Sequence, residues 1–341
     1  MKKEIVLVTG GAGYIGSVLV RELLNKGEKV RVFDKLYFGR ESLAEVEKEI
    51  ELIQGDVRNF DDSCLDGVKA VMHFGSLSND PTAEFDPKAN REINFEGTMK
   101  VAEACKTKGI EKFTFASSCA IIGFHVDEIA DENYPPNPQS EYAASKLEAE
   151  EGLKSLADEK FCPVIFRQAT VYGFSPRMRY DLVVNTMVKD AYDKGIIYVY
   201  HGGEMWRPLV DIRDVAKAHI KSLDAPKEKV RGEVFNLVFK NFNIFELGHW
   251  IQEILKNMKK VEVEVLHGTK ESRSYKVSGE KIKKVLGFEP KISVADSARE
   301  IFEVLKSGRY TDFSNPIYYN IDWMMLLSDM EKKLKIIGKV L

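Results

Sequence analysis

A tyrosine and a lysine four positions apart are the residues of this sequence best suited to chemistry. They are Tyr142 and Lys146 in the segment EYAASKLEAE, which has the pattern of a helix. Residues i and i+4 share one face of a helix, so the ammonium should lie beside the phenol. A neighbouring cation favours the phenolate and lowers the tyrosine pKa from about 10. Tyr142 can therefore act as a base near neutral pH.

A hydroxyl donor is also needed to hold a substrate oxygen beside that tyrosine. Ser117 and Ser118 close the β-rich run KFTFASS and supply two candidates. The three residue types together predict a site for proton transfer.

A glycine-rich turn stands at the start of the chain, in VLVTGGAGYIG. Glycines there let the backbone approach a pyrophosphate, and the following helix N-terminus offers unpaired N–H groups. The spacing is G-x-x-G-x-x-G, and a tight turn that needs small residues is the alternative interpretation. The predicted dinucleotide contacts in this turn are Gly10, Gly13, Tyr14, Ile15 and Gly16.

Two acidic residues extend this prediction. Asp34 ends KVRVFD about 20 residues further on, where a carboxylate can bind both adenosine ribose hydroxyls and repel a 2′-phosphate. NAD is therefore favoured over NADP, although Lys35 could partly accommodate a phosphate. Asp56, before Val57, is placed to reach the adenine amino group, or else caps a helix.

The elements that must position these residues alternate between short β-rich runs and helical patterns. Helices are predicted near 14–26, 88–109 and 140–157, and this rhythm indicates βαβ units and a parallel sheet. The strands are continuous apolar runs, as expected where helices cover both faces. We expect a dinucleotide-binding domain from 1–172 and 208–243, and a smaller lobe from 173–207 and 244–341. A terminal helix from Trp323 should cover the core.

Composition narrows the partners. Of 341 residues, 30% are charged and the net charge is −3, so no general field attracts nucleic acid or an anionic membrane. Four cysteines lack CxxC spacing and six histidines lack a metal-ligand pattern, so no disulfide framework or metal site is predicted. The first residues leave no room for a signal peptide, and we expect a cytoplasmic protein with a small-molecule substrate.

The motifs TGGAGYIG, FASSCAIIG, YAASK and RQATVYG, with Asp34 and GDV, resemble the extended short-chain dehydrogenase/reductase family. The likeness is to its nucleotide-sugar epimerase/dehydratase branch, including UDP-glucose 4-epimerase-like members. It implies an α/β fold: a Rossmann doubly wound parallel sheet with a smaller C-terminal α/β substrate lobe. It also implies NAD as cofactor, a nucleotide-diphosphate sugar as substrate, and a homodimer formed through the two long helices.

The resemblance assigns roles to individual residues. Ser118 becomes the catalytic serine and Ser117 a cofactor contact, Tyr142 is the acid/base, and Lys146 binds the nicotinamide ribose. The segment HFGSLS should pass under the cofactor's ribose and pyrophosphate, with Asn94 beneath the catalytic elements. The residues of this segment that we expect to contact the cofactor are Phe74, Gly75, Ser76 and Ser78.

Substrate contacts are predicted from the same likeness. Arg207 and Arg273 match arginines that bind the diphosphate, with a surface or interdomain salt bridge as the alternative for each. Asn79 and Asp80 could bind sugar hydroxyls or cap the turn before Pro81. Thr170 replaces an asparagine found in many relatives. The remaining candidates are Asn185 and Tyr275.

A departure from the family pattern selects among its reactions. Cys119 and Ala120 stand where members that eliminate water carry an Asp-Glu pair, which argues against a 4,6-dehydratase. We therefore predict 4-epimerisation through a transient 4-keto sugar. The alternatives are an NAD(P)-dependent keto-sugar reductase, with Cys119 as a possible acid/base, a 4,6-dehydratase, and a non-catalytic dinucleotide-binding regulatory protein.

Overall fold

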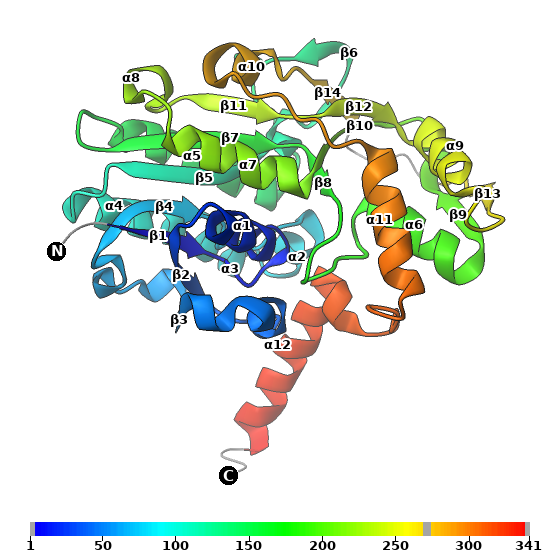
Figure 1. Ribbon diagram of the computed structural model, residues 1–341, viewed down its shortest axis with the longest axis horizontal. Helices are drawn as coiled ribbons and strands as arrows, with labels where there is room; N and C mark the ends of the chain where they lie inside the picture. Colours follow the sequence, from blue (N-terminus) through cyan, green and yellow to red (C-terminus); the bar gives the residue numbers. More distant parts are fainter. Residues whose placement is uncertain (1–3, 269–273, 338–341) are drawn as a thin grey trace.

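The computed structural model of the chain describes residues 4–268 and 274–337. Its largest element is a seven-stranded parallel sheet of order β11-β7-β5-β4-β1-β2-β3 (Figure 1). The predicted Rossmann sheet is thereby confirmed. Its strands are β1 (Ile5–Thr9), β2 (Lys29–Asp34), β3 (Ile50–Gln54), β4 (Val68–His73), β5 (Lys112–Ser118), β7 (Cys162–Gln168) and β11 (Val234–Leu237).

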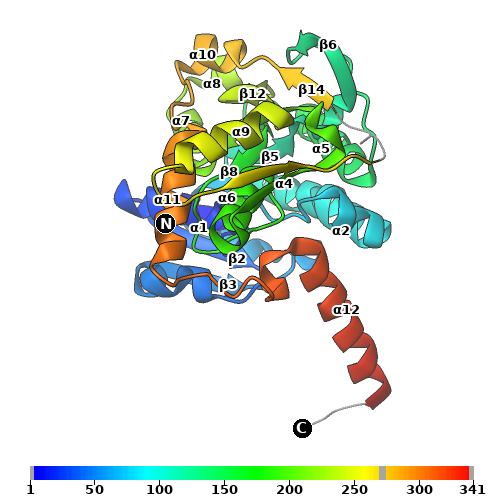
Figure 2. The ribbon, with the colours of Figure 1, turned by 90° about the vertical axis from the view of Figure 1, so that its right-hand side faces the viewer.

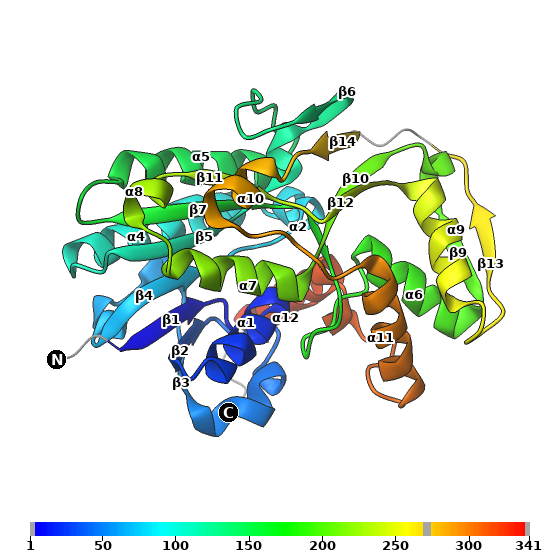
Figure 3. The same ribbon diagram turned by 45° about the horizontal axis from the view of Figure 1, so that its top comes forward.

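Helices flank this sheet on both faces (Figure 3). The helices predicted near 14–26 and 140–157 are present, whereas the one predicted near 88–109 consists of three consecutive segments, the middle one a π-helix. The helices are α1 (Tyr14–Asn25), α2 (Asp80–Phe85), α3 (Pro87–Arg91), η4 (Glu92–Gly97), α4 (Thr98–Thr107), α5 (Glu141–Leu156) and α7 (Ile212–Leu223).

Alternate residues of β1 enter two different cores. Val6 and Val8 pack in the core that contains residues of α1 and α7, whereas Leu7 packs with residues of α4 and α5. Burial of both faces explains the continuous apolar runs of the strands. The strand order reverses between β1 and β4, so a crevice opens at the carboxyl ends of these strands, where ligands bind in this topology.

A second lobe has its own core (Figure 3). Three helices and a short parallel strand pair surround this core, and a three-stranded sheet joins it to the large sheet. Its elements are β8 (Thr170–Tyr172), α6 (Val183–Lys194), β9 (Ile196–Val199), η6 (Tyr200–Gly203), β10 (Trp206–Asp211), β12 (Lys240–Asn243), α9 (Ile244–Leu255), β13 (Glu262–Val265) and α11 (Val294–Lys306).

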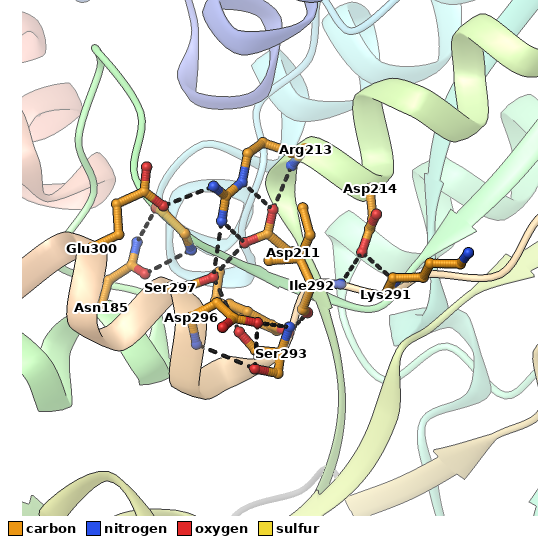
Figure 4. Close-up of polar contacts among 12 residues, drawn as sticks. Asn185, Asp211, Arg213, Asp214, Lys291, Ile292, Ser293, Asp296, Ser297 and Glu300 are labelled. Atoms are coloured by element: carbon orange, nitrogen blue, oxygen red, sulfur yellow. Dashed lines mark hydrogen bonds and ion pairs between the residues drawn. The ribbon is translucent and has the colours of Figure 1, made fainter. Parts of the chain in front are cut away.

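Polar contacts hold the two lobes together where β10 ends (Figure 4). Asp211 is fully buried, caps α7 through the Arg213 backbone N–H, and accepts a hydrogen bond of 2.5 Å from Ser297 on α11. The Arg213 guanidinium also binds Asp211, at 3.0 Å. This buried cluster fixes the end of β10 and therefore the strand that carries Arg207.

The predicted division of the chain stays a prediction, and two C-terminal segments pack against the dinucleotide-binding half. Strand β14 (Ser274–Val277) pairs with β6 (Phe124–Ala130), and the helix after it, α10 (Glu280–Leu286), adds Ile282 to the core of α1 and α7. The second C-terminal segment that packs against this half is the start of α12. The remaining elements are η1 (Glu41–Glu49), η2 (Val57–Asn59), η3 (Asp62–Leu65), η5 (Cys119–Ile122), α8 (Lys227–Val230), η7 (Pro316–Tyr318) and α12 (Asn320–Ile337).

The terminal helix α12 projects away from the body of the molecule (Figures 1 and 2). Met324 in its first turns packs against the core of α4 and α5, but Leu326, Met330 and Leu334 are exposed. The expectation that this helix covers the core therefore holds only for its first turns. None of the helices in the described part of the chain is both long and apolar enough to cross a membrane.

Candidate active site

The glycine turn after β1 forms a cradle with no room for side chains. Gly10 has φ +70°, and a Cβ there would lie 2.6 Å from the Phe74 carbonyl. A Cβ on Gly16 would lie 2.1 Å from the Gly10 oxygen. Helix α1 starts after Gly13 without a side-chain cap, so its first N–H groups face the cavity that Gly10 and Gly13 line. A turn of this geometry suits a pyrophosphate group, and that role stays a prediction.

Asp34 lies at the end of β2, in the wall of the same cavity of about 110 Å³. Its carboxylate accepts hydrogen bonds from the backbone N–H groups of Ala12, at 2.9 Å, and Leu36, at 2.7 Å. Burial raises the pKa of this carboxyl group. Asp34 is thus held against the glycine turn, where the ribose of a bound dinucleotide is expected.

Asp56 caps a short helix, which is one of its two predicted roles, and its contact with the adenine stays a prediction. Its carboxylate caps η2 through the Arg58 N–H at 3.0 Å and binds the Arg58 guanidinium at 2.7 Å. Arg58 lowers the pKa of Asp56 to about 2. Asp56, Val57 and Lys35 also line the cavity, with the Lys35 Nζ 3.4 Å from the Asp56 carboxylate.

The segment after β4 forms the floor between Asp34 and the predicted catalytic residues. Phe74, Gly75, Ser76 and Ser78 line the cavity. Asn94 is fully buried behind them, accepts a hydrogen bond from the Leu77 N–H and donates one to its carbonyl. Asn94 therefore holds the segment in place and does not line the cleft.

Tyr142 and Lys146 project from the first half of α5, which Ser140 caps. Lys146 is fully buried, and its ammonium donates to the Ser76 hydroxyl at 3.0 Å and the Ala116 carbonyl at 2.9 Å. Burial lowers the pKa of Lys146 to about 7, and the Glu150 carboxylate acts in the opposite direction. The lysine therefore connects the floor of the cofactor cavity to the face of α5 that carries Tyr142.

The two serines at the end of β5 have different surroundings. The Ser117 hydroxyl donates to the buried carboxylate of Glu150, which Arg167 also binds at 2.9 Å. The Ser118 side chain caps η5 by accepting a hydrogen bond from the Ala120 N–H at 3.1 Å. Both residues line the cleft with Tyr142 and Lys146, but only the Ser118 hydroxyl is free of the buried ion pair.

A cleft of about 630 Å³ continues from the glycine turn past Ser118 and Tyr142 toward the second lobe. Arg207 lies in its wall, with its guanidinium carbon 6.0 Å from the centre of the Tyr275 ring. Asn79 caps α2 and Asp80 accepts a hydrogen bond from Ser140 at 2.7 Å. The predicted substrate residues that line the cleft are Asn79, Asp80, Thr170, Arg207 and Tyr275.

Of the residues predicted to contact the substrate, one is buried away from the cleft and one lies outside the described part of the chain. Asn185 is fully buried and does not line the cleft, because its side chain binds the Gly173 N–H, the Tyr14 hydroxyl and the Arg179 carbonyl. Its contacts join α6 to Tyr14, the first residue of α1, and to the segment that follows β8. Arg273 lies outside the described residues.

Sequence reasoning missed two arginines in the cleft. Arg177 and Arg179 follow β8 in the segment SPRMRYD and line the cleft. Arg179 forms a two-pronged ion pair with Asp181, with N–O distances of 2.8 and 2.9 Å. The available signal was that both arginines follow the RQATVYG motif within six residues.

Cys119 and Ala120 are both buried next to Ser118. The Cys119 thiol contacts the Arg167 carbonyl, at 3.1 Å, and burial raises its pKa. A thiol in this setting stays protonated and serves packing. Among the described residues that line this cleft, the only carboxylates are Asp80 and Asp181.

Comparisons with known proteins agree with this geometry. A model of the NAD-dependent epimerase/dehydratase family matches residues 6–237. The putative UDP-glucose 4-epimerase of Methanocaldococcus jannaschii is 28% identical over 319 residues, 90% of this chain and 100% of that protein.

Solved structures of this fold carry more than one named activity. The UDP-glucose 4-epimerase of Thermotoga maritima, with UDP-glucose, has a TM-score of 0.78 and 24% identity, over 89% of this chain and 99% of that one. The dTDP-glucose 4,6-dehydratase of Streptomyces venezuelae has a TM-score of 0.77 and 25% identity, over 92% of this chain and 99% of that one.

Proposed function

This chain belongs to the NAD-dependent epimerase/dehydratase family, and from that premise we propose that it catalyses the 4-epimerisation of a nucleotide-diphosphate sugar. It is an NAD-dependent enzyme, as the sequence predicted. One observation carries the choice of reaction: Ser118 and Tyr142 line a single cleft between the glycine turn and the arginines, and no carboxylate follows Ser118.

The cofactor would be held by the glycine turn, Asp34 and Lys146. NAD, when bound, accepts a hydride from a carbon that bears a hydroxyl group and returns it. Tyr142, as a phenolate that the Lys146 cation stabilises, removes the proton from that hydroxyl group, carries it as a neutral phenol, and later gives it back. Ser118 donates a hydrogen bond to the same oxygen. Neither step needs a further acid or base.

The substrate class follows from charge. Arg207, on β10, lines the part of the cleft that the second lobe forms. Guanidinium groups bind diphosphate oxygens in two-pronged fashion. The arrangement therefore favours a nucleoside diphosphate linked to a sugar that reaches Tyr142.

The test is a panel of UDP-, GDP-, dTDP- and CDP-sugars incubated with the purified protein and no added cofactor. Conversion of one sugar into its 4-epimer, detected by proton NMR, is the expected result, and Tyr142→Phe is the matched inactive control. Stoichiometric release of NADH would contradict epimerisation and favour a dehydrogenase or reductase. Loss of water from the sugar would favour a dehydratase. Absence of turnover with every sugar would favour the regulatory alternative.

A homodimer in the cytoplasm belongs to the same proposal. The pairing would use α4 and α5, the long helices on one face of the sheet. All four cysteines are free and buried, which suits a reducing compartment. Light scattering after size-exclusion chromatography tests the dimer, and cell fractionation tests the location.

A further inference from the structure

The segment that leads into α12 is anchored on the second lobe. Tyr180, after β8, is fully buried, and its backbone N–H donates to the Tyr318 carbonyl at 2.9 Å. Its hydroxyl donates to the Tyr310 carbonyl at 2.8 Å. The rings of Phe313 and Tyr318 pack edge-on against the Tyr180 ring, at 5.5 and 5.2 Å between centroids. The segment 310–319 therefore packs against that lobe's core.

The next residues contact the dinucleotide-binding half. The Asn320 side chain donates to the Ser78 hydroxyl at 2.9 Å, and the Trp323 indole N–H donates to the Tyr37 carbonyl at 2.5 Å. Asn320 and Met324 line the cavity that also contains Asp34. The segment thus crosses from one lobe to the other beside the cavity in which the adenosine is predicted to lie.

Asn320 also binds the guanidinium group of Arg177, which forms no ion pair with a carboxylate among the described residues. Its side-chain oxygen accepts a hydrogen bond of 2.7 Å from the Arg177 guanidinium, which lies 3.7 Å from the centre of the Phe38 ring. Arg177 is 6% exposed, and its Nε has no hydrogen-bond partner among the described residues. The nearby Asp181 carboxylate is occupied by Arg179.

A buried guanidinium in this state needs an anion. Burial without a paired charge costs free energy and lowers the pKa of Arg177 to about 9. Arg177 lines the cleft together with Gly10 and Gly13, the turn that presents backbone N–H groups to a pyrophosphate. The anion that would satisfy both the turn and the guanidinium is a diphosphate.

We infer that residues 310–324 complete the NAD site. In this arrangement Arg177 binds the cofactor's pyrophosphate, Asn320 is the positioning residue for Arg177, and Trp323 with Met324 closes the adenosine end. The inference rests on the proposed function in that NAD occupies the cleft. It deepens that function, because an enzyme that returns hydride to the same sugar gains from slow cofactor release.

The test measures how fast labelled NAD leaves the full-length holoprotein when unlabelled NAD is added in excess. Asn320→Ala and the conservative Trp323→Phe each remove hydrogen bonds, and each should speed release about tenfold. Leu334→Ala, on the projecting part of α12, is the matched control and should release NAD at the parental rate.

Asn320→Asp separates cofactor binding from a merely structural contact. Its carboxylate would pair with Arg177 and compete with the pyrophosphate, so NAD affinity should fall about tenfold while the melting temperature without NAD stays unchanged or rises. A structural contact alone would make affinity and melting temperature change together.

Two outcomes would overturn the inference. One is parental NAD release by both Asn320→Ala and Trp323→Phe. The other is unchanged NAD release with weakened binding of UDP, which would assign Arg177 to the diphosphate of the sugar nucleotide. Neither measurement needs a sugar substrate. Failure of the epimerase assay with altered NAD release would therefore refute the proposed activity and leave this inference standing.

Discussion

The ammonium of Lys146 lies 5.9 Å from the centre of the Tyr142 ring, one turn further along α5. The two residues are neighbours because of helical periodicity. The lysine ammonium is held in place by the Ser76 hydroxyl, after β4, and by the Ala116 carbonyl, near the end of β5. The buried Lys146 side chain therefore holds its charge next to the phenol, where electrostatic interactions are stronger than in water.

Replacement of Tyr142 by phenylalanine should abolish proton transfer and leave cofactor binding intact. The ring stays and only the hydroxyl is lost, so kcat should fall by about 10²–10⁴-fold, the range for removal of a general acid or base. Epimer formation followed by NMR, together with the amount of NAD that copurifies, measures both effects. Comparable turnover in this variant would exclude Tyr142 as the acid/base.

The neighbouring serines should respond differently to alanine. Ser118→Ala removes the hydroxyl group near the reacting oxygen and should lower kcat about 10²-fold. Ser117→Ala removes a hydrogen bond to Glu150 and should lower the free energy of unfolding by about 1 kcal/mol, with kcat nearly unchanged. Urea unfolding and steady-state kinetics should be measured for both variants, so that each variant serves as the control for the other. The reverse pattern would identify Ser117 as the catalytic serine.

Asp34 should make the protein prefer NAD to NADP. Its carboxylate, fixed by the Ala12 and Leu36 N–H groups, would repel a 2′-phosphate, and we expect NAD to bind at least about tenfold more tightly. Asp34→Asn should narrow this ratio, as measured by equilibrium dialysis. Equal affinities in the parent protein would show that Lys35 compensates for the carboxylate.

Acid should destabilise the fold through two buried histidines. Burial lowers the pKa values of His73 and His219 from 6.5 to about 3, so between these values the unfolded chain binds protons that the folded chain cannot. Stability is complete above pH 6.5 and is lost as the pH falls, by about 2 kcal/mol per histidine at pH 5.

His219→Gln tests this pH dependence. Glutamine does not titrate, so the drop in the free energy of unfolding between pH 7 and pH 5 should shrink by about 2 kcal/mol. His249→Gln is the control, because His249 is exposed on α9 and should leave the drop unchanged. Identical pH profiles for His219→Gln and the parent would contradict a neutral buried imidazole.

Glu150 should be essential to stability. It is fully buried and paired with Arg167, and Glu150→Gln would leave that guanidinium uncompensated, at a cost of about 3–5 kcal/mol. Glu151→Gln, one residue further along α5 and exposed, should be nearly neutral. Denaturant unfolding of both variants measures the difference. A small effect for Glu150→Gln would mean that the pair is replaced by other contacts.

The segment 88–109 shows a feature of the fold that the local sequence pattern could not predict. The apolar spacing indicated one long helix, and the chain instead passes through a π-helical segment that contains Asn94. The extra residue in the turn places the Asn94 amide against the backbone of Leu77, a contact that joins two distant parts of the chain. Periodicity within the segment carries no information about that partner.

The sequence by itself determined the parallel sheet, the glycine turn with Asp34, and the Tyr142–Lys146 pair, because each is encoded by spacing within one element or by the alternation of consecutive elements. Only the tertiary structure decided that Ser117 faces Glu150, that Asn185 is structural, and that Arg177 meets Asn320. Arg177 and Asn320 are 143 positions apart. Contacts of this kind depend on how the two lobes pack around the cleft, and no local periodicity encodes them.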